Sequence, residues 1–584
     1  MHGTPPPSTS YPPLHVAPAL RRALRAGYGL SDLRADALAG VVVGVIALPL
    51  SMALAIATGA PPQHGLYTAI VAGAVAALLG GCPVQVTGPT AAFVVVLAPL
   101  TSRYGLTGLM LATAFAGGLL LLMGVARLGR LIEFVPFPVT TGFTAGIAIV
   151  IATLQTRDLL GLRVEHLPDH FLERVLALVR AGPTARWPDV AVGAMTLAAL
   201  FISPRIIRRL PAALVALPIG TVLGLVLNHL GYPCETVQSR FGGIPQAPPV
   251  PMWPWAFDGP PAGTEPLTPE AFRPLMLASV TIALLGAIES LLSAVVAAGL
   301  SGREHDPDAE LIAQGAANLI TPFFGGFAAT GAIARTAANI RSGARSPLAA
   351  VFHAAFLLLG VLVAAPWLGY LPMASMAALL VLVAWNMSEA RHVVHMLKVA
   401  PRSDNLIMLT CLGLTVVFDM TVAVTVGVAL AALLFMQRMA DVTGVRLVTE
   451  MPAPLERPLP SNVLLYEVAG PLFFGAAQRA MSAIQRVDRS VSVVVLDLRA
   501  VPVKDATGLV NLESALRKLH EAQIYTIIAG IQNQPLNLLA RAGWKHRDWL
   551  SVYRSFEHGI ESARNLAHLL VAEPPTATGA SSRA

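Results

Sequence analysis

Residues 80–90, GGCPVQVTGPT, are echoed by residues 325–340, GGFAATGAIARTAANI. In each copy a pair of glycines precedes a Thr-Gly step, at Thr87-Gly88 and at Thr330-Gly331. Each copy comes third in its half of the apolar region, after two longer apolar segments, so two units of seven segments are implied. An odd number of segments per unit gives the two units opposite orientations across a membrane. The sequence therefore predicts an inverted repeat.

The composition indicates a polytopic membrane protein. Of the 584 residues, 12% are charged and 55% are hydrophobic, and the mean hydropathy is +0.65. Soluble globular proteins carry roughly 25% charged residues. Apolar runs long enough to cross a bilayer recur from about residue 37 to residue 437. A soluble multidomain enzyme is excluded.

We expect eleven full spans and three shorter segments, fourteen in all. The shorter segments, 84–101, 309–324 and 328–342, are too short or too rich in Gly, Pro and polar residues to cross a hydrocarbon core of ~30 Å alone. The expected membrane domain is therefore all-α and includes two half-helices. The full spans are predicted near 37–59, 64–80, 105–127, 135–155, 189–204, 211–230, 275–298, 346–365, 372–387, 404–418 and 420–437.

The distribution of positive charge predicts the orientation of these segments. Lys and Arg near membrane segments are retained on the cytoplasmic side. The fourteen-segment scheme places Arg127, Arg205, Arg341 and Lys398 on the same side as the N-terminal arginines. We therefore expect a multi-pass protein with both termini in the cytoplasm and loop 231–272 outside.

The chain is predicted to have five parts. A cytoplasmic tail without a signal peptide is expected at 1–36, the transport domain at 37–437 and a Pro-rich linker at 438–460. From 461 to 572 strand-like runs such as VSVVVLDL alternate with helix-like runs such as TGLVNLESALRKLH, which predicts a cytosolic α/β domain. A disordered tail is expected at 573–584.

The repeated Thr-Gly motifs are the best candidate for a binding site. Interrupted segments in corresponding positions are typical of a transporter's site, because non-helical backbone at membrane depth must be covered by protein or line a cavity. Pro89 suits a first helical position, and Thr330 could supply an N-cap oxygen. Two half-helices starting near the midplane would direct free N–H groups at one small anion. Alternatively, the glycines only permit close helix packing.

Two charged residues lie within predicted membrane segments. Glu289 is in mid-span, where a carboxylate costs ~2.5 kcal/mol or more, so we expect a function. Ser293 follows at i+4 on the same helical face, so the pair could coordinate a cation, or Glu289 could carry a proton. Arg335 lies one turn inside the second half-helix and is predicted to contact the anion. An ion pair of Glu289 and Arg335 that only fixes packing is the alternative.

Other candidate sites are weaker. Asp419 is interpreted as a helix cap and His353 as a packing residue. The three cysteines show no metal-ligand spacing, and no nucleotide loop, nucleophile or metal cluster accompanies the buried charges. We therefore expect no metal, no cofactor and no enzyme activity. The basic residues form no stripe with aromatics, so nucleic acid is not an expected partner.

Several motifs together resemble the SulP (sulfate permease) family of anion transporters over about residues 30–570. They are GVIALPLSMALAIATGAPPQHGLYTAI, GGCPVQVTGPTAAFVVVL, GAIESLLSAVV, FFGGFAATGAIARTAANIRSGARSPLAAVFHA, PLFFGAAQ and DLRAVPVKDATGL. The resemblance implies seven plus seven inverted segments, a core domain that moves against a gate domain in an elevator-like way, a cytosolic STAS domain and a homodimer. It also implies the inner membrane of a bacterial cell as the location.

The resemblance also assigns residues. The anion site would lie between Thr87, Gly88 and Thr90 in the third segment and Thr330, Gly331, Ala332 and Arg335 in the tenth. Glu289 and Ser293 match eighth-segment positions linked with cation coupling in bacterial members. Thr507 matches the position that is phosphorylated in related bacterial STAS proteins, although a plain loop at a helix N-terminus is the preferred interpretation. A cytosolic protein could bind the STAS domain.

Within the family, the runs GRLIEFVP, LLGAIESLL, RTAANI and AALLVLVAWNMSEA most resemble enterobacterial aerobic C4-dicarboxylate transporters. The leading hypothesis is therefore proton-coupled symport of succinate, fumarate, aspartate or a similar anion across the lipid bilayer. Transport of sulfate or bicarbonate, coupled to protons or sodium, is the alternative. An anion channel, a membrane-bound regulator and a nucleobase transporter are further rivals.

Overall fold

The computed structural model describes twelve stretches of the chain in two compact units, Met1–Ala429 and Leu430–Ala584. The described residues are 17–132, 135–164, 168, 170–207, 210–257, 272–418, 420–442, 444–448, 458–470, 491–501, 506–544 and 547–572. Each unit has a hydrophobic core of its own.

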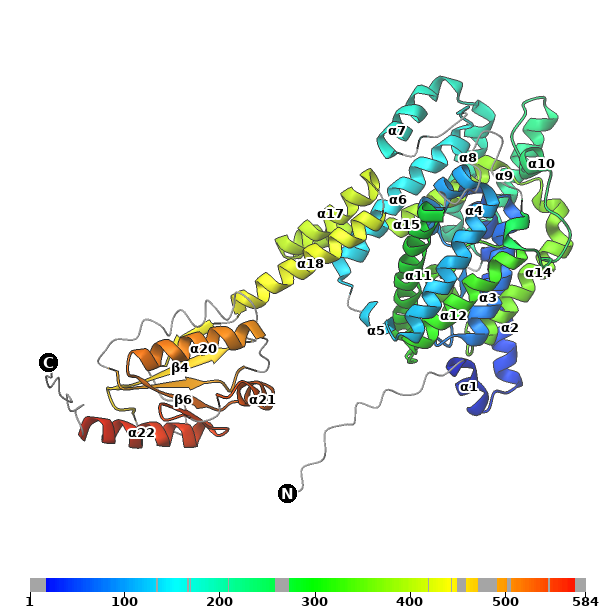
Figure 1. Cartoon of the computed structure of the whole chain (residues 1–584). Coiled ribbons are helices and arrows are strands. Elements are labelled where there is room, and N and C mark those ends of the chain that lie inside the picture. Colours follow the sequence, from blue (N-terminus) through cyan, green and yellow to red (C-terminus); the bar gives the residue numbers. More distant parts are fainter. Residues whose placement is uncertain are drawn as a thin grey trace. The chain divides into compact units, whose positions relative to one another are not determined.

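The first unit is a bundle of helices (Figure 1). Ten helices in the described residues are long and apolar enough to cross a membrane. The segments of its first half are α2 (Leu30–Ala57), α3 (Pro62–Leu79), α4 (Ala91–Val125), α6 (Phe137–Leu160), α8 (Trp187–Ile206) and α9 (Ala212–His229). Those of its second half are α11 (Phe272–Ser301), α12 (Pro307–Ile320), α13 (Ile333–Arg341), α14 (Leu348–Leu368), α15 (Met373–Ser388), α17 (Arg402–Val417) and the beginning of α18 (Met420–Val442), whose residues from Leu430 onward belong to the second unit.

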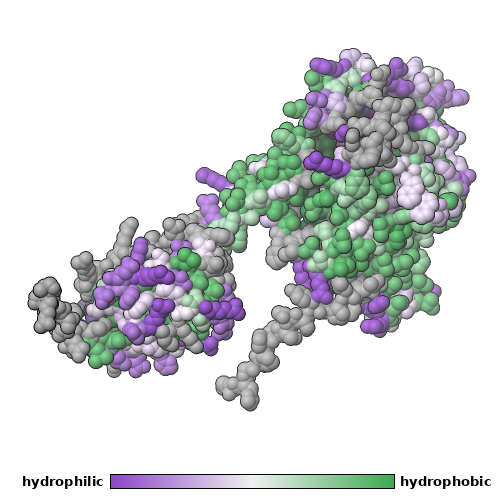
Figure 2. Space-filling view, in the orientation of Figure 1, coloured by the Kyte–Doolittle hydropathy of each residue, from purple (hydrophilic) through white to green (hydrophobic). Residues whose placement is uncertain are grey.

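The surface of this unit suits a bilayer. Figure 2 shows hydrophobic residues over the middle of its visible face and hydrophilic residues toward its two ends. Many large apolar side chains are exposed in these helices, including Leu122, Val222, Leu277 and Leu359. Without lipid around them, such side chains would form large apolar patches in water, which soluble monomers rarely expose.

Helix α4 accounts for two of the expected segments. It extends from Ala91 to Val125, but it is interrupted at Gly105, whose backbone is non-helical, with φ 65° and ψ −166°. Only glycine adopts such a conformation readily, so the helix breaks there. The predicted segments 84–101 and 105–127 are thus joined in one kinked element, and α4 counted as two brings the segments to fourteen.

Helices α12 and α13 are the short segments of the second half. They contain 14 and 9 residues, which give lengths of about 21 and 14 Å at 1.5 Å per residue. Neither length crosses a core of ~30 Å, as the sequence predicts.

The helix contacts repeat when the two halves are exchanged. Helix α2 packs on α14, and its counterpart α11 packs on α4. In the same way α3 packs on α14 while α12 packs on α4, and α6 packs on α17 while α15 packs on α8. In each comparison, the helices of the second pair are the segments that lie seven positions along the chain from those of the first pair. The predicted inverted repeat is therefore present in the packing.

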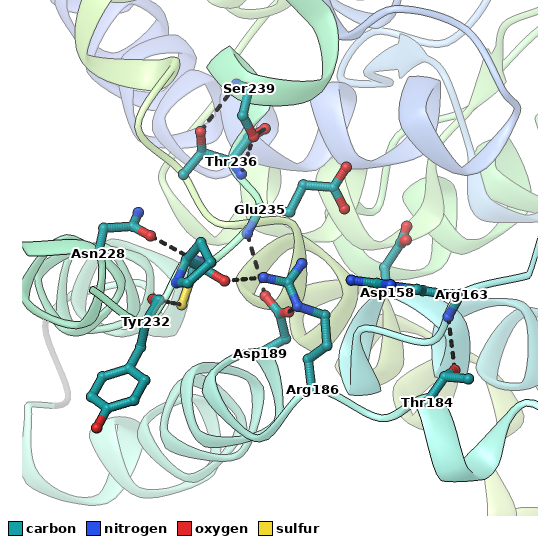
Figure 3. Close-up of polar contacts among 12 residues, drawn as sticks. Asp158, Arg163, Thr184, Arg186, Asp189, Asn228, Tyr232, Glu235, Thr236 and Ser239 are labelled. Carbon is teal, nitrogen blue, oxygen red and sulfur yellow. Dashed lines mark hydrogen bonds and ion pairs between the residues drawn. The ribbon is translucent and has the colours of Figure 1, made fainter. Parts of the chain in front are cut away.

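Short helices connect these segments, and one connection is held by charged groups. Arg240 contacts Glu235 through two hydrogen bonds of 2.7 and 2.5 Å and Asp158, at the end of α6, at 2.9 Å. Nearby, Asp189 of α8 accepts the Glu235 N–H (Figure 3). The short helices are α1 (Pro18–Arg25), α5 (Gly129–Ile132), α7 (Phe171–Arg180), α10 (Val237–Phe241) and α16 (Ala390–Val399).

This charged connection also joins the two halves of the bundle. The Val237 N–H donates to the Leu371 carbonyl at 3.0 Å, and the Met373 N–H donates to the Glu235 carbonyl at 2.9 Å. These two hydrogen bonds therefore hold the segment at the start of α10 against the connection between α14 and α15.

We predict that Arg240→Ala lowers the melting temperature by a few degrees at pH 7. The hydrogen bonds and charge of Arg240 hold the pKa of the Glu235 carboxyl below its usual value. A carboxyl with a depressed folded-state pKa stabilises the protein above its unfolded pKa, about 4.3, and this stabilisation is lost as pH falls. The difference from wild type in thermal unfolding should therefore shrink as pH falls below ~4. Arg180→Ala, an exposed arginine, is the control; an equal loss at all pH values would contradict the prediction.

The second unit is a five-stranded sheet with helices on both faces (Figure 1). Its strand order is β3 (Gly444–Leu447), β4 (Val463–Ala469), β5 (Val493–Asp497), β6 (Tyr525–Ala529) and β7 (Leu550–Val552). Only the β3–β4 pair is antiparallel among these. Alternate strand residues face opposite sides, so Val494 and Leu496 pack with α20 (Ala506–Glu521) and α21 (Asn533–Arg541). Val493 and Val495 pack with α22 (Phe556–Ala572).

The predicted α/β character of this unit is confirmed. The runs LLYEV, VSVVVLDL and IYTIIAG form β4, β5 and β6, and TGLVNLESALRKLH forms most of α20. The predicted helical run GAAQRAMSAIQRV, the tail 573–584 and the expected cap residue Asp419 lie outside the described residues.

Candidate functional site

The two repeated Thr-Gly motifs meet inside the helical unit. β1 (Thr87–Gly88) pairs antiparallel with β2 (Thr330–Gly331), so that Thr87 lies opposite Gly331 and Gly88 opposite Thr330. Both strands are buried. The Ala332 N–H extends the pairing by donating to the Val86 carbonyl at 2.9 Å. Segments more than 240 residues apart in sequence thus satisfy each other's backbone groups.

Each strand leads directly into a helix that begins at this place. Thr90 is the N-cap of α4, and Ala332 is the N-cap of α13. The first N–H groups of a helix lack intrahelical acceptors and carry partial positive charge. Two helix starts beside one pair of strands form the arrangement that the sequence predicts for a small anion.

Two predicted capping details are wrong. Pro89 is not the first residue of α4, because Thr90 adopts the extended N-cap conformation and the helix starts at Ala91. Thr330 is not the cap of α13. Its side chain lies next to α11 instead, where the hydroxyl bonds the Gly286 carbonyl at 3.1 Å and the Ser290 hydroxyl at 2.7 Å. Thr330 is held by its pairing with Gly88, and Pro89 directly follows the paired strand β1, before either helix begins.

Arg335 extends from α13 across the start of α4. Its side chain is 3% exposed, and its Nη2 donates to the Pro89 carbonyl. Its Nη1 is buried without a hydrogen-bond partner in the described part of the chain. A guanidinium carries five N–H donors, so buried donors remain for an anion. This free nitrogen is the feature that points most directly to a ligand.

Gly88 provides the room for this guanidinium. A Cβ at position 88 would lie 2.4 Å from Arg335 Nη1. Any side chain there would displace the charge from its place between the two helix starts. The absence of a side chain at the glycine of the first motif is therefore required for the observed position of the arginine in the second motif.

Glu289 and Ser293 lie on the same helix but have different partners. Glu289 on α11 accepts a hydrogen bond of 2.9 Å from the Thr90 hydroxyl, at the start of α4. Ser293 donates to the Thr336 hydroxyl of α13 at 3.2 Å, and Thr336 also accepts the Val86 N–H at 3.1 Å. In the described residues, Glu289 and Arg335 do not form an ion pair. The packing alternative for these two charges is therefore not supported by a direct contact.

A polar ridge on α12, which the sequence analysis missed, supports both strands. Glu310, Gln314 and Asn318 are spaced by four residues and are all buried. The amide of Gln314 donates to Thr87 at 2.7 Å, and Asn318 bonds both the N–H and the carbonyl of Ala329 at 2.8 Å. One helix face therefore positions β1 and the residue before β2.

Glu310 anchors the loop that leads to β1. Its Oε2 accepts the N–H groups of Gly81 and Cys82, and its Oε1 accepts the amides of Gln85 and Gln314, all at 3.0 Å. Four N–H donors suit an ionised carboxylate, which only accepts hydrogen bonds. The i, i+4, i+8 spacing of Glu, Gln and Asn within 309–324 was the sequence signal for this ridge.

Thr507 lies in the other unit. It is the second residue of α20 and is exposed, and its carbonyl accepts a hydrogen bond of 3.0 Å from the Asn511 side chain. The neighbouring Asp505 lies outside the described residues. A position near a helix N-terminus agrees with the preferred interpretation of this loop.

We predict that Glu310→Gln destabilises the helical unit by about 1–3 kcal/mol for each buried donor left without an acceptor. A glutamine amide would direct its own N–H groups at two of the four existing donors. The expected result is a lower melting temperature in detergent together with reduced anion uptake. Glu173→Gln, on the exposed part of α7, is the matched control. A melting temperature equal to that of wild type would show that Glu310 does not anchor this loop.

Comparisons with known proteins place this chain in a family. The model of the sulfate permease family matches residues 33–411, and the STAS domain model matches residues 455–557. The putative sulfate transporter YvdB of Bacillus subtilis is 38% identical over 538 residues, which cover 92% of this chain and 98% of that protein. The bicarbonate transporter BicA of Picosynechococcus is 30% identical and covers 86% of this chain and 90% of its own length.

A solved structure supports the fold. The murine Solute Carrier 26 family member A9 anion transporter in the inward-facing state superposes with a TM-score of 0.80 at 17% sequence identity, covering 94% of each chain. At that identity the likeness concerns the fold alone. Taken with the family models and the two relatives, it leads to one conclusion: the chain belongs to the sulfate permease family of anion transporters and carries a STAS domain near its C-terminus.

Proposed function

We propose that the protein is a proton-coupled secondary active transporter whose anion binds between the starts of α4 and α13. The observation that carries this proposal is the buried Nη1 of Arg335, which has no partner in the described residues and lies beside Gly88. A fixed positive charge and two helix starts favour a small anion and exclude a cation from the same place. The residues proposed to contact the anion are Thr87, Gly88, Thr90, Thr330, Gly331, Ala332 and Arg335.

The substrate we favour is a compact oxyanion such as sulfate or bicarbonate. Arg335 is the single guanidinium that reaches the paired strands in the described residues. A compact anion can place two of its oxygens against one guanidinium and has no distant second charge, whereas the second carboxylate of a C4-dicarboxylate would need another donor group. The names of the relatives YvdB and BicA agree with this choice.

C4-dicarboxylates are the second candidate. The observation in their favour is the resemblance of residues 377–390, AALLVLVAWNMSEA, to dicarboxylate transporters. This run forms most of α15, which packs against α6 and α8. Succinate therefore belongs in the first transport assay beside sulfate and bicarbonate.

Glu289 is the proposed coupling residue, and its hydrogen bonding suits a group that gains and loses a proton. Its partner is the Thr90 hydroxyl, which can either donate or accept a hydrogen bond. The contact can therefore persist in both protonation states. Glu310, with four N–H donors, offers no such freedom. Sodium held near Glu289 and Ser293 is the competing mode of coupling.

Alternating access is proposed to follow the family's elevator-like scheme. The helices that carry the site, α3, α4, α11, α12 and α13, contact one another and would move as the core. Helices α6, α8, α15 and α17 pack together and would form the gate, at the interface of a homodimer in the membrane. Protonation of Glu289 on anion binding would reduce the net charge carried across the bilayer.

The transport test uses purified full-length protein in proteoliposomes with an imposed inward proton gradient. We predict uptake of labelled sulfate or bicarbonate above the equilibrium level and its collapse with a proton ionophore. Arg335→Ala should lower uptake at least tenfold because the anion loses its fixed charge, whereas Arg341→Ala, an exposed arginine at the end of the same helix, should not. Accumulation of succinate alone would overturn the favoured substrate, and flux that never exceeds equilibrium would indicate a channel.

Uptake by wild type should rise as the external pH falls, because a lower pH supplies the coupling proton to Glu289. We predict that Glu289→Gln abolishes concentrative uptake and removes this pH dependence while exchange of anions across the membrane continues. The measurement is initial uptake rate at several external pH values, with Glu173→Gln as the control. Wild-type pH dependence and accumulation in Glu289→Gln would assign coupling to another group.

A further inference from the structure

A cavity of about 530 Å³ lies at one end of the helical unit, apart from the anion site. Helix α1, its connection to α2 and the start of α2 form one wall, and the others come from the connections α3–α4, α11–α12 and α13–α14. Under the expected topology this end faces the cytoplasm. The lining residues are Ala19, Arg22, Ala23, Ala26, Gly27, Tyr28, Asp32, Pro83, Arg303, Glu304 and Arg345.

Three arginines from three separate segments converge on this cavity. Arg22 of α1 donates to the carbonyls of Pro18, Gly81 and Glu304 at 3.3 to 3.5 Å. Arg303 donates to the carbonyl of Arg345. These acceptors are neutral backbone groups, so the charges of Arg22 and Arg303 are not compensated through these bonds.

Arg345 is the arginine that forms an ion pair here. Its Nη1 contacts Asp32 at 2.8 Å, and its backbone N–H donates to Asp36 at 2.6 Å. With Glu304 as the other acid of the lining, three arginines stand against two carboxylates, and the formal charge of the cavity is +1. Several of the five N–H donors of each guanidinium remain for an oxyanion.

The chemistry of the cavity fits a phosphate group. A planar guanidinium binds two phosphate oxygens at once, and three arginines from separate segments line this cavity. The walls also carry apolar groups, from Ala19, Ala23 and Pro83. A phosphate ester with an attached organic group would use both kinds of lining.

The surroundings of the cavity favour a lipid as the bearer of that phosphate. Leu24 in α1 is 56% exposed, and Leu30, the first residue of α2, is 73% exposed. Helix α2 continues from Leu30 into the expected membrane region. A basic pocket at the end of membrane helices, with apolar side chains directed outward beside it, is the arrangement that recognises anionic headgroups.

We propose that this cavity binds the phosphate of an anionic phospholipid headgroup through Arg22, Arg303 and Arg345. The site has a direct connection to the anion site. Arg22 bonds the Gly81 carbonyl, and the Gly81 N–H is held by Glu310 of the polar ridge. Residues 81–86 then lead to β1. A bound lipid therefore braces α1 against the loop that positions Thr87.

The binding test uses full-length protein in liposomes of equal phosphatidylglycerol and phosphatidylcholine, followed by extraction and native mass spectrometry of retained lipid. We expect at least threefold enrichment of phosphatidylglycerol on wild type. Arg22→Ala and Arg303→Ala should abolish the enrichment. Arg21→Ala is the matched control, because Arg21 is an exposed arginine on the same helix and does not line the cavity. Equal loss in Arg21→Ala, or no enrichment on wild type, would overturn the proposal.

Two further arms distinguish the source of the phosphate and guard against misfolding. Inorganic phosphate and glycerol 1-phosphate at millimolar concentration should not displace the lipid; binding of either one with no lipid enrichment would replace the lipid by a soluble ligand. Arg22→Lys keeps the positive charge but loses the paired N–H donors of the guanidinium, so the variant should fold and retain less lipid than wild type. If Arg22→Lys retained as much lipid as wild type, the paired N–H donors of Arg22 would not be needed for lipid binding. These readouts do not depend on transport, so they stand apart from the proposed function.

Discussion

The structure depends on one constraint: non-helical backbone at membrane depth must find its hydrogen-bond partners inside the protein. Here the partners are two strands of two residues each, which come from opposite halves of the chain and pair with each other. The polar ridge of α12 forms hydrogen bonds with backbone groups outside the two strands, in the loop before β1 and at Ala329. Because water is excluded, each of these bonds is costly to lose, and the central geometry is held firmly.

This central pairing produces the features of the proposed anion site. Two helices can begin in the middle of the unit only because the strands before them are satisfied, and each start contributes free N–H groups. Gly88 in one strand leaves space for Arg335 from the helix after the other strand. The two buried carboxylates nearby have different surroundings. Glu310 is surrounded by N–H donors and acts as a structural anion, whereas Glu289 has a hydroxyl partner that tolerates either protonation state.

The features predicted from sequence were those with local causes. The apolar segments, the break in α4 near Gly105 and the short α12 and α13 follow from length, glycine and polarity within a few neighbours. The predictions for Pro89 and Thr330 failed because helix starts at this place are set by strand pairing with residues far away in sequence. Glu310 was missed because its importance lies in donors from residues 81–85, which sequence spacing does not bring near it.

The sequence by itself determined the inverted repeat, the location in a membrane and the family, because repetition, hydropathy and motifs are properties of the chain alone. It also supplied the residues proposed for the anion site. Tertiary structure decided which of those residues meet. It placed Arg335 beside Gly88, gave Glu289 and Ser293 different hydrogen-bond partners, and gathered three arginines from distant segments around one cavity. The physical reason is that hydrogen bonds and charges act over a few ångströms in space, and only packing sets those distances.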